Sequence, residues 1–424
     1  MKKDKYVIIG NSIAAIGAIE RIREYDKEGS ILVISQENYH VYSRPMIPGF
    51  VYGKYKEERL LFRERNFYKK NNVRVILGKK VVKIDASKKE VFAEDEERFS
   101  FEKLLIATGG KPFVPPIKGH DEDCLTFTTL DDAKKIIDIS KDAKDFVVIG
   151  AGLIGLKLAE SLAKIGKNVK VVELADRVLS AITDQKASDI FLKLFMKNKV
   201  DIMLKCTVSE ILREEGRIKG VLLSNGERLR CDSVAVAIGV VPNTDIAKES
   251  GINVNRGIVV NDRMETSIKE VYAAGDVAEA FDIINNENRN IPLWPNASLQ
   301  GKIAGSNMAG HDEKYPGSYM MNSISFFDLP VISYGLVNTE GDNFEILEKN
   351  NGNAYKKIII KNNRIVGAIF VDDIDRAGII NGLIRDKVDV SGFKEHLVNG
   401  SIGLVYLPKK LRDERLKTVP RVEL

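Results

Sequence analysis

Residues 145–155 read DFVVIGAGLIG, an apolar run followed by three glycines within six positions. The run predicts a buried parallel strand, and the apolar side chains that follow at helical spacing predict a helix. Gly150 permits the tight turn between them, Gly152 lets the backbone approach a pyrophosphate, and Gly155 lets the helix pack closely on the strand. Together with Ile154 in the first helical turn, these glycines predict a dinucleotide-binding β-α-β unit.

An acidic residue lies where the ribose of such a dinucleotide is expected. Glu173 ends the next predicted strand, residues 167–173, and follows Gly150 by 23 positions. Its carboxylate can accept hydrogen bonds from a ribose diol, and it would repel a 2′-phosphate. The sequence therefore predicts NADH rather than NADPH as the reductant, with Arg177 close enough in sequence to soften the preference.

A second β-α-β unit opens the chain. Tyr6–Gly10 and Ser30–Ser35 are short apolar runs on either side of a segment with Ala and Ile at helical spacing. In the turn, Ser12 stands where a second glycine is expected and Ala15 where a third is, and Glu37 follows the second run by two residues. Two such units, about 140 residues apart, predict an α/β fold with two doubly wound parallel sheets.

Composition limits the classes of function. The chain has 424 residues, 44% hydrophobic and 29% charged, which predicts two or three globular domains. The net charge is +5, and the chain has no block of basic residues of the kind typical of nucleic-acid binding. A soluble surface of mixed charge is the simpler interpretation, and a local basic patch that faces an acidic partner protein is the weaker alternative. Cys124, Cys206 and Cys231 form no CxxC pair, which favours a reducing, cytoplasmic location. We expect no membrane span, no N-terminal signal segment and no metal site.

Five motifs occur in one order along the chain: Gly10-Asn11-Ser12, Ala107-Thr108-Gly109, Gly150–Gly155, Ala237–Thr244 and Ala273-Ala274-Gly275-Asp276. This order resembles that of the FAD-dependent pyridine nucleotide-disulfide oxidoreductase superfamily, over residues 1 to about 310. The resemblance implies two doubly wound Rossmann-like dinucleotide-binding domains plus a C-terminal α+β domain.

The resemblance also implies domain boundaries. FAD would bind a domain made of residues 1–110 and 240–315, NAD would bind an inserted domain at 111–239, and an interface domain would occupy 316–424. In the last of these, Tyr355–Lys361 and Arg364–Val371 predict two strands that are joined at an Asn-Asn turn.

Residues at the cofactors follow from the same resemblance. In the family, the acid matching Asp276 binds the ribityl chain of FAD, and an N-cap role for this residue stays open beside it. The segment Trp294–Ala304 predicts a loop and then a helix, whose N-terminus would stabilise an anionic reduced flavin. The set implied for FAD is Gly10, Ser12, Ala15, Glu37, Arg44, Pro45, Val81, Ala107, Thr108, Gly109, Gly275, Asp276, Ala297 and Gln300. The set implied for NAD is Gly150, Gly152, Ile154, Gly155, Glu173 and Gly239.

The segment after the second strand decides the class of electron acceptor. Residues 36–53 contain no cysteine, so they offer no thiolate that could attack a disulfide. They resemble instead the Arg-Pro segment of rubredoxin reductases, ferredoxin-type reductases and the flavoprotein parts of nitrite reductases, with Arg44 and Pro45 at the matching positions. Some relatives carry a Ser-Lys pair just after it, which Pro48-Gly49 replaces here.

One pair of residues is a candidate for chemistry at the nicotinamide. Many relatives carry Glu two residues past the third glycine, where this chain has Lys157, and Glu160 lies three positions further. Residues three apart share a helix face and can form an ion pair. A role at the nicotinamide and an ordinary helical ion pair both stay open.

Together these features predict a flavoenzyme that moves electrons from NADH through FAD to an external acceptor, a small iron–sulfur or rubredoxin-type protein. Two alternatives need the same cofactors: an oxygen-reducing NADH oxidase without a redox cysteine, and a slow-turnover flavoprotein with a binding or signalling role. The implied interface domain is compatible with a homodimer.

Overall fold

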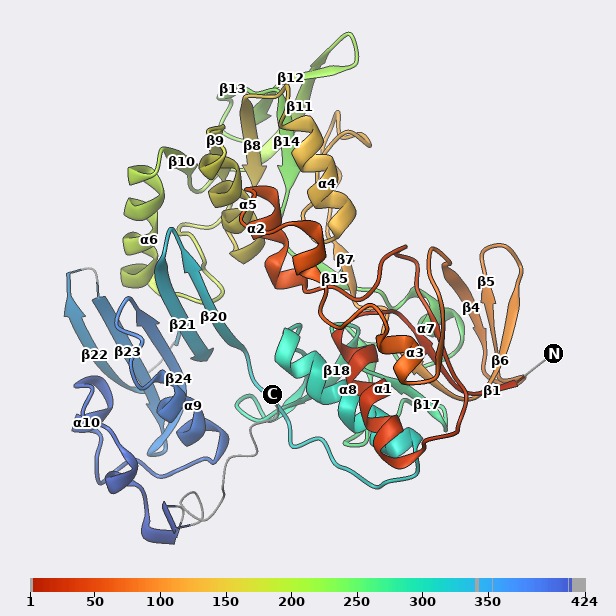
Figure 1. The fold of residues 1–424 in the computed structure, drawn as a ribbon. Coiled ribbons are helices and arrows are strands. Elements are labelled where there is room, and N and C mark those ends of the chain that lie inside the picture. The colour runs from red at the N-terminus through yellow and green to blue at the C-terminus, as the bar shows by residue number, and fades with distance from the viewer. Residues whose placement is uncertain (1–2, 340–342, 353, 411, 414–424) are drawn as a thin grey trace. The chain divides into compact units, whose positions relative to one another are not determined.

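The computed structural model describes residues 3–339, 343–352, 354–410 and 412–413 (Figure 1). The chain divides into two compact units. One contains the residues up to Val178 together with Leu192–Tyr319, and the other contains Leu179–Phe191 together with the residues from Met320 onward. In the described ranges, no helix combines the length and the apolar character needed to cross a membrane.

The first sheet is built around the opening β-α-β unit and has seven strands in the order β3-β2-β1-β6-β5-β4, with β17 added beside β6. The parallel pairing of β1 with β2 and β6 brings the carboxyl ends of these strands to one edge. The strands are β1 (Lys3–Ile9), β2 (Ile31–Ile34), β3 (Val73–Ile76), β4 (Val81–Asp85), β5 (Glu90–Ala93), β6 (Arg98–Ile106) and β17 (Val271–Ala273).

Two long helices of this part pack together through glycines. They are α1 (Ile13–Tyr25) and α8 (Trp294–Met308). A Cβ added to Gly301 would lie 2.0 Å from the carbonyl oxygen of Ala14, and one added to Gly305 would lie 2.6 Å from that of Ala18. These glycines therefore let the backbone of α8 reach α1 directly.

Smaller elements complete this part. The helical segments are η1 (Arg44–Met46), α2 (Ile47–Val51), η2 (Glu57–Leu60), α3 (Phe67–Lys70) and α7 (Asp245–Glu249), and a three-stranded sheet contains β16 (Ile258–Val259), β18 (Ala278–Asp282) and β19 (Glu287–Asn290). In Figure 1, α2 lies beside two helices of the next sheet, α4 (Leu130–Ile139) and α5 (Leu153–Lys164).

The second sheet is parallel, with the order β10-β9-β8-β14, and repeats the first topology. Its strands are β8 (Asp145–Ile149), β9 (Asn168–Val172), β10 (Val200–Met203) and β14 (Ser233–Val236), and α6 (Gln185–Lys197) follows β9 in the chain. A three-stranded antiparallel sheet accompanies it, with β11 (Val208–Glu214), β12 (Arg217–Leu223) and β13 (Arg228–Arg230). The chain enters and leaves this part through an antiparallel ribbon of β7 (Gly110–Pro112) and β15 (Val240–Pro242).

The C-terminal unit contains a five-stranded antiparallel sheet in the order β20-β21-β24-β23-β22. The strands are β20 (Met321–Phe326), β21 (Leu329–Gly335), β22 (Glu345–Asn351), β23 (Ala354–Lys361) and β24 (Arg364–Val371), followed by α9 (Ala377–Arg385), α10 (Glu395–Val398) and η3 (Leu404–Tyr406). Asn362 and Asn363 join β23 to β24 with φ of 50° and 58°, as a tight hairpin turn requires. The segment Leu179–Phe191 is held on this sheet by Asp184, which accepts a hydrogen bond from the Tyr355 hydroxyl at 2.6 Å.

The predicted class, with two parallel α/β sheets and an α+β tail, is therefore confirmed. One local prediction was wrong, and one alternative that the sequence left open is excluded. The helix predicted after a loop begins at Trp294 itself, because Pro295 fits the first helical turn. Asp276 caps no helix: it lies in a turn, and the chain then runs directly into β18.

Candidate functional site

The first Gly turn joins β1 to α1. Gly10 has a φ of +108°, and a Cβ there would lie 2.1 Å from the carbonyl oxygen of Ala107, so only glycine fits. Asn11 is fixed from two sides, because its Oδ1 accepts from the Tyr68 hydroxyl at 2.5 Å and its Nδ2 donates to the carbonyl of Tyr39 at 3.2 Å. Ser12 is the N-cap of α1, and its side chain makes no capping bond. Its hydroxyl and the first N–H groups of α1 therefore fit a phosphate.

In the second Gly turn, two glycines are required by close packing, and the third has open space at its Cβ position. A Cβ on Gly150 would lie 2.5 Å from the carbonyl oxygen of Ala237, and one on Gly155 would lie 2.0 Å from that of Gly150. At Gly152, apart from the glycine and its two chain neighbours, no atom of the described residues lies within 4 Å of the Cβ position. The space at Gly152, at the N-terminus of α5, is thus open to a pyrophosphate, and Ile154 follows in the first turn of that helix.

The carboxylate of Glu173 is already oriented by the backbone at the end of β9. One oxygen accepts from the N–H of Ala151 in the Gly turn at 2.6 Å, and the other accepts from the N–H of Ala175 at 2.8 Å. The side chain remains partly exposed. The acid therefore lies beside the second Gly turn, where an acid that binds the ribose diol of a dinucleotide would lie.

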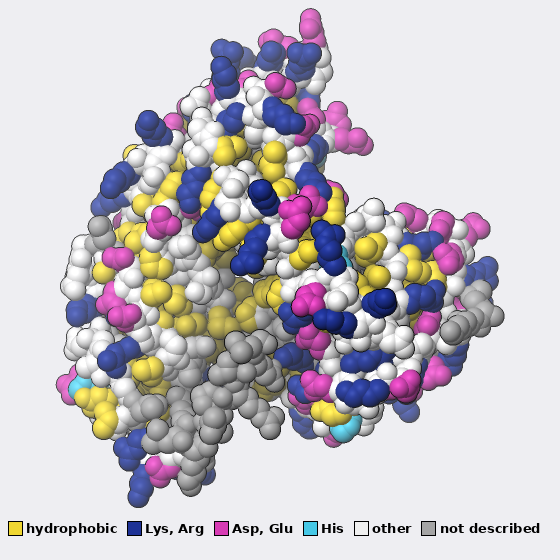
Figure 2. Space-filling model, in the orientation of Figure 1, with side chains coloured by type: hydrophobic (Ala, Val, Ile, Leu, Met, Phe, Trp, Pro, Cys, Tyr) yellow, Lys and Arg dark blue, Asp and Glu magenta, His cyan; other side chains and the backbone are white. Residues whose placement is uncertain are grey.

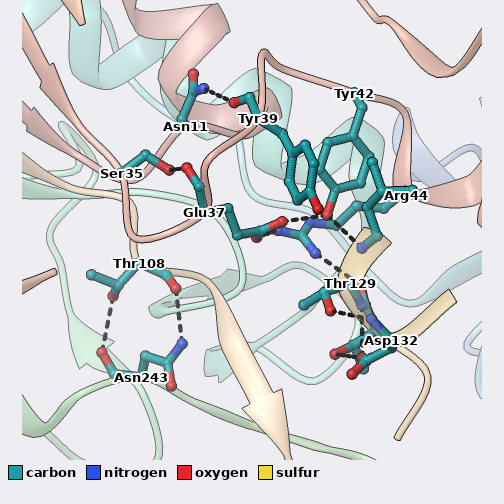
Figure 3. Close-up of polar contacts among 12 residues, drawn as sticks. Asn11, Ser35, Glu37, Tyr39, Tyr42, Arg44, Thr108, Thr129, Asp132 and Asn243 are labelled. Atoms are coloured by element: carbon teal, nitrogen blue, oxygen red, sulfur yellow. Dashed lines mark hydrogen bonds and ion pairs between the residues drawn. The ribbon is translucent and has the colours of Figure 1, made fainter. Parts of the chain in front are cut away.

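A polar network follows the end of β2 (Figure 3). The carboxylate of Glu37 forms an ion pair with Arg44 and accepts from the Tyr42 hydroxyl, while the Ser35 hydroxyl donates to the carbonyl of Glu37 at 3.1 Å. Burial has the largest single effect on the Arg44 guanidinium and lowers its pKa, but the charges of Glu37 and Tyr42 and the hydrogen bond to Glu37 together outweigh it, so the net pKa is raised. Burial also raises the pKa of Tyr42, so its hydroxyl stays protonated and available as a donor.

The same network reaches the start of α4. Arg44 donates to the carbonyl of Thr128 at 2.8 Å, and the N–H of Leu130 donates to the Tyr42 hydroxyl at 3.1 Å. Thr129 and Asp132 form a capping box that fixes this end of α4 (Figure 3). Sequence reasoning placed Arg44 in the site but missed its bond across the chain, because the contact spans 84 positions.

The turn after β17 is tied to α8. Gly275 donates its N–H to Oε1 of Gln300 at 2.9 Å, and a Cβ added to Gly275 would lie 3.6 Å from that of Ala297. Asp276 follows, and burial raises the pKa of its carboxyl while the charge of Arg44 opposes that shift. Hydroxyl donors of a polyol would compensate for that burial, so the residue fits the ribityl chain of FAD.

Two hydrogen bonds join Thr108, which lies just before β7, to Asn243, which lies just after β15 (Figure 3). The Thr108 hydroxyl donates to the carbonyl of Asn243, and the Asn243 amide donates to the carbonyl of Thr108, both at 2.9 Å. Gly109 and Gly239 adopt φ of +64° and +126° at the strand ends. The Thr108 hydroxyl therefore serves the ribbon of β7 and β15, a role that the motif alone did not reveal.

Four other predicted residues lie in different settings. Lys157 forms an ion pair with the buried Glu160, whose second oxygen pairs with Lys164 at 2.7 Å. Val81 is 6% exposed in the core, whereas Pro45 is exposed in η1. A role at a cofactor stays a prediction for each.

The cysteines lie in the core of the second sheet, and the N–H of Cys206 donates to the carbonyl of Glu173 at 3.1 Å. Cys124, Cys206 and Cys231 are free and belong to the buried cluster of the second sheet. Burial raises the pKa of all three thiols, that of Cys231 to about 12. They are therefore poor nucleophiles. Among the described residues, no group of three His, Cys, Asp or Glu side chains could hold a metal ion.

Comparison with known proteins agrees with this geometry. Residues 4–301 match the family model "Pyridine nucleotide-disulphide oxidoreductase", and residues 321–388 match "Rubredoxin NAD+ reductase C-terminal domain". The epsilon subunit of the NADH-dependent phenylglyoxylate dehydrogenase of Aromatoleum evansii is 33% identical over 401 residues, which cover 93% of this chain and 94% of that protein. An NADH oxidase of Methanocaldococcus jannaschii is 32% identical over 319 residues, or 73% of this chain and 71% of that one.

A solved structure gives the same result. The NADH:rubredoxin oxidoreductase of Clostridium acetobutylicum superposes with a TM-score of 0.78 at 27% identity, covering 93% of this chain and 98% of that chain. Such relatives are NAD(P)H-dependent flavin oxidoreductases. The two Gly turns, the acids that follow them and these matches together show that the chain belongs to the pyridine nucleotide-disulphide oxidoreductase family, whose cofactors are FAD and NAD(H).

Proposed function

We propose that the chain oxidises NADH and delivers the electrons to a small iron–sulfur or rubredoxin-type protein. The observation that carries the proposal is the content of residues 36–53. Where disulfide reductases of the family hold a redox cysteine, this chain has Glu37, Tyr42 and Arg44 in one polar network. No thiol relay is therefore available, and the acceptor must come to the flavin.

The residues of the two turns would hold the cofactors. The first turn and Asp276 would bind FAD, and the second turn and Glu173 would bind NADH. When bound, the flavin supplies the chemistry of accepting a hydride and releasing electrons one at a time. The protein binds and orients: Arg44 keeps Glu37 in place, and Gln300 fixes the turn that carries Asp276.

We also propose that NADH is preferred over NADPH. The carboxylate of Glu173 is held at the end of β9 by two backbone N–H groups, so it cannot easily move away from a 2′-phosphate. The two would repel each other at close range.

Direct reduction of oxygen is the second candidate, favoured by the similarity to the Methanocaldococcus jannaschii NADH oxidase. Steady-state rates separate the two functions. We expect the FAD-loaded protein to reduce rubredoxin or a ferredoxin with NADH, anaerobically, at least tenfold faster than it consumes NADH in air without a carrier. Equal rates would favour the oxidase. A triple Cys→Ser variant should keep the carrier activity, and its loss would reinstate a thiol mechanism.

The proposal also includes the domain boundaries, the location in the cell and the oligomeric state. The boundaries 1–110 and 240–315, 111–239, and 316–424 would separate FAD-binding, NAD-binding and interface domains. The protein would work in the cytoplasm, which the three unpaired cysteines support. It would form a homodimer, which light scattering on the purified protein would test.

A further inference from the structure

A basic segment lies directly beside the proposed flavin site. Between residues 54 and 70 the chain carries seven lysines and arginines against three glutamates, so this short stretch holds most of the net charge of +5. Lys54, Arg59, Arg65 and Lys69 are exposed. On the face drawn in Figure 2, Lys and Arg side chains lie over the region of α3.

The middle of this segment forms an isolated antiparallel bridge with residues 41–43, which precede Arg44 in the chain. The N–H of Ser43 donates to the carbonyl of Leu60 at 2.8 Å, and the N–H of Phe62 donates to the carbonyl of Val41 at 3.1 Å. The basic segment is therefore fixed to one of the elements proposed to flank the flavin.

The same segment contacts the second flanking element, the N-terminus of α8. The rings of Phe62 and Trp294 meet edge to face, with centroids 5.5 Å apart. The guanidinium of Arg63 lies 4.3 Å from the Phe62 ring centroid and forms an ion pair with Glu20 at 2.7 Å. Both rings are only partly buried. An aromatic pair with an arginine, Arg63, stacked on it has the composition typical of a binding hot spot.

We infer that this basic aromatic surface, made of Phe62, Trp294 and the cations of residues 54–70, is where an acidic electron carrier docks. The inference rests on the proposed function and adds the place of contact to it. Positive charge attracts an acidic partner at a distance, and the aromatic pair supplies the desolvated centre of the contact. One NADH supplies two electrons, so it reduces two Fe(III) rubredoxins to Fe(II) and leaves NAD⁺ and one proton.

Charge reversal at two exposed positions tests the surface. Arg59→Glu with Arg65→Glu changes no residue of the proposed cofactor sites. We expect the second-order rate constant for rubredoxin reduction to fall about 10- to 100-fold at low ionic strength. Ferricyanide, a small acceptor, should be reduced within about twofold of the parent rate. The difference in this rate constant between variant and parent should shrink as the salt concentration is raised from about 0.01 M to about 1 M. The reason is that the Debye screening length falls from about 30 Å to about 3 Å over that range.

Lys219→Glu with Arg230→Glu is the matched control, since it changes the net charge equally at exposed positions on β12 and β13. An equal fall in this control, or a change of less than twofold in the Arg59/Arg65 variant, would overturn the inference while leaving the proposed function intact. If the parent protein itself fails to reduce rubredoxin, the proposed function fails first. Trp294→Ala should lower carrier reduction, and Trp294→Phe should restore most of it; equal rates in both variants would contradict the role of the aromatic pair.

Discussion

Replacing Glu173 by Gln is the sharpest test of cofactor choice. The amide keeps one acceptor oxygen, so one of the two N–H groups, that of Ala151 or that of Ala175, loses its partner. The ribose diol of NADH also loses its charged acceptor, and a hydrogen bond to a charged group contributes about 1.5–3 kcal/mol, which predicts a roughly 10- to 150-fold lower kcat/KM with NADH.

The same change removes a repulsion from NADPH. Two like charges about 4 Å apart repel by roughly 4 kcal/mol at an effective dielectric constant of 20, and partial exposure of Glu173 reduces that to about 2 kcal/mol. The parent should therefore favour NADH by about 30-fold or more, and the variant should bring the two cofactors close to parity.

Initial rates of ferricyanide reduction with each nucleotide measure the ratio directly. Asp176→Asn is the matched control, because this neighbouring acid is 55% exposed and pairs with Arg177 instead of the Gly turn. Its NADH to NADPH ratio should stay within about threefold of the parent. A parent that uses both nucleotides equally, or a Glu173→Gln variant with an unchanged ratio, would refute the role assigned to this acid.

Further substitutions separate folding from binding. Gly152→Ala should leave the melting temperature unchanged yet weaken NADH at least tenfold, whereas Gly155→Ala should fail to fold stably, since its methyl would meet the carbonyl of Gly150; calorimetry and NADH titration distinguish them. Asp276→Asn should raise the melting temperature of the cofactor-free protein at pH 7, because burial raises the pKa of this carboxyl and its stability cost grows as pH rises through that pKa. The same variant should bind FAD about tenfold or more weakly, by loss of a charged hydrogen-bond acceptor; unchanged affinity would remove Asp276 from the site. Asp26→Asn should lower the melting temperature at pH 7: burial raises the Asp26 pKa, but bonds from Lys5 and the Gly29 N–H outweigh it and hold the pKa low. That stability is lost as pH falls below about 4, so the difference between variant and parent should disappear in acid.

Local chemistry explains what the sequence could predict. The φ of +105° at Gly150 and the two left-handed asparagines at 362 and 363 are imposed by short turns, and a turn is determined by neighbouring residues. The strands around them follow from continuous apolar runs. The two β-α-β units and the position of Glu173 at the end of a strand could therefore be predicted from the sequence.

Contacts between distant parts of the chain could not be predicted this way. The pair of hydrogen bonds between Thr108 and Asn243 joins residues 135 positions apart, and the bond from Tyr355 to Asp184 joins residues 171 apart. The spacing of apolar residues along the chain does not indicate which distant acceptor a side chain will bond to. Asp276 illustrates the same limit: a carboxylate after a strand can cap a helix, which the sequence left open, but the chain turns into β18 instead.

Reoxidation of the reduced protein tests the central claim most directly. The FAD-loaded protein is reduced anaerobically with one equivalent of NADH and mixed with rubredoxin in a stopped-flow instrument, while the visible absorbance of flavin and iron is followed. We predict that two rubredoxins are reduced per NADH, at a rate that rises with rubredoxin concentration and exceeds the rate of reoxidation by air. Reoxidation that is indifferent to rubredoxin and fast in air would contradict the account.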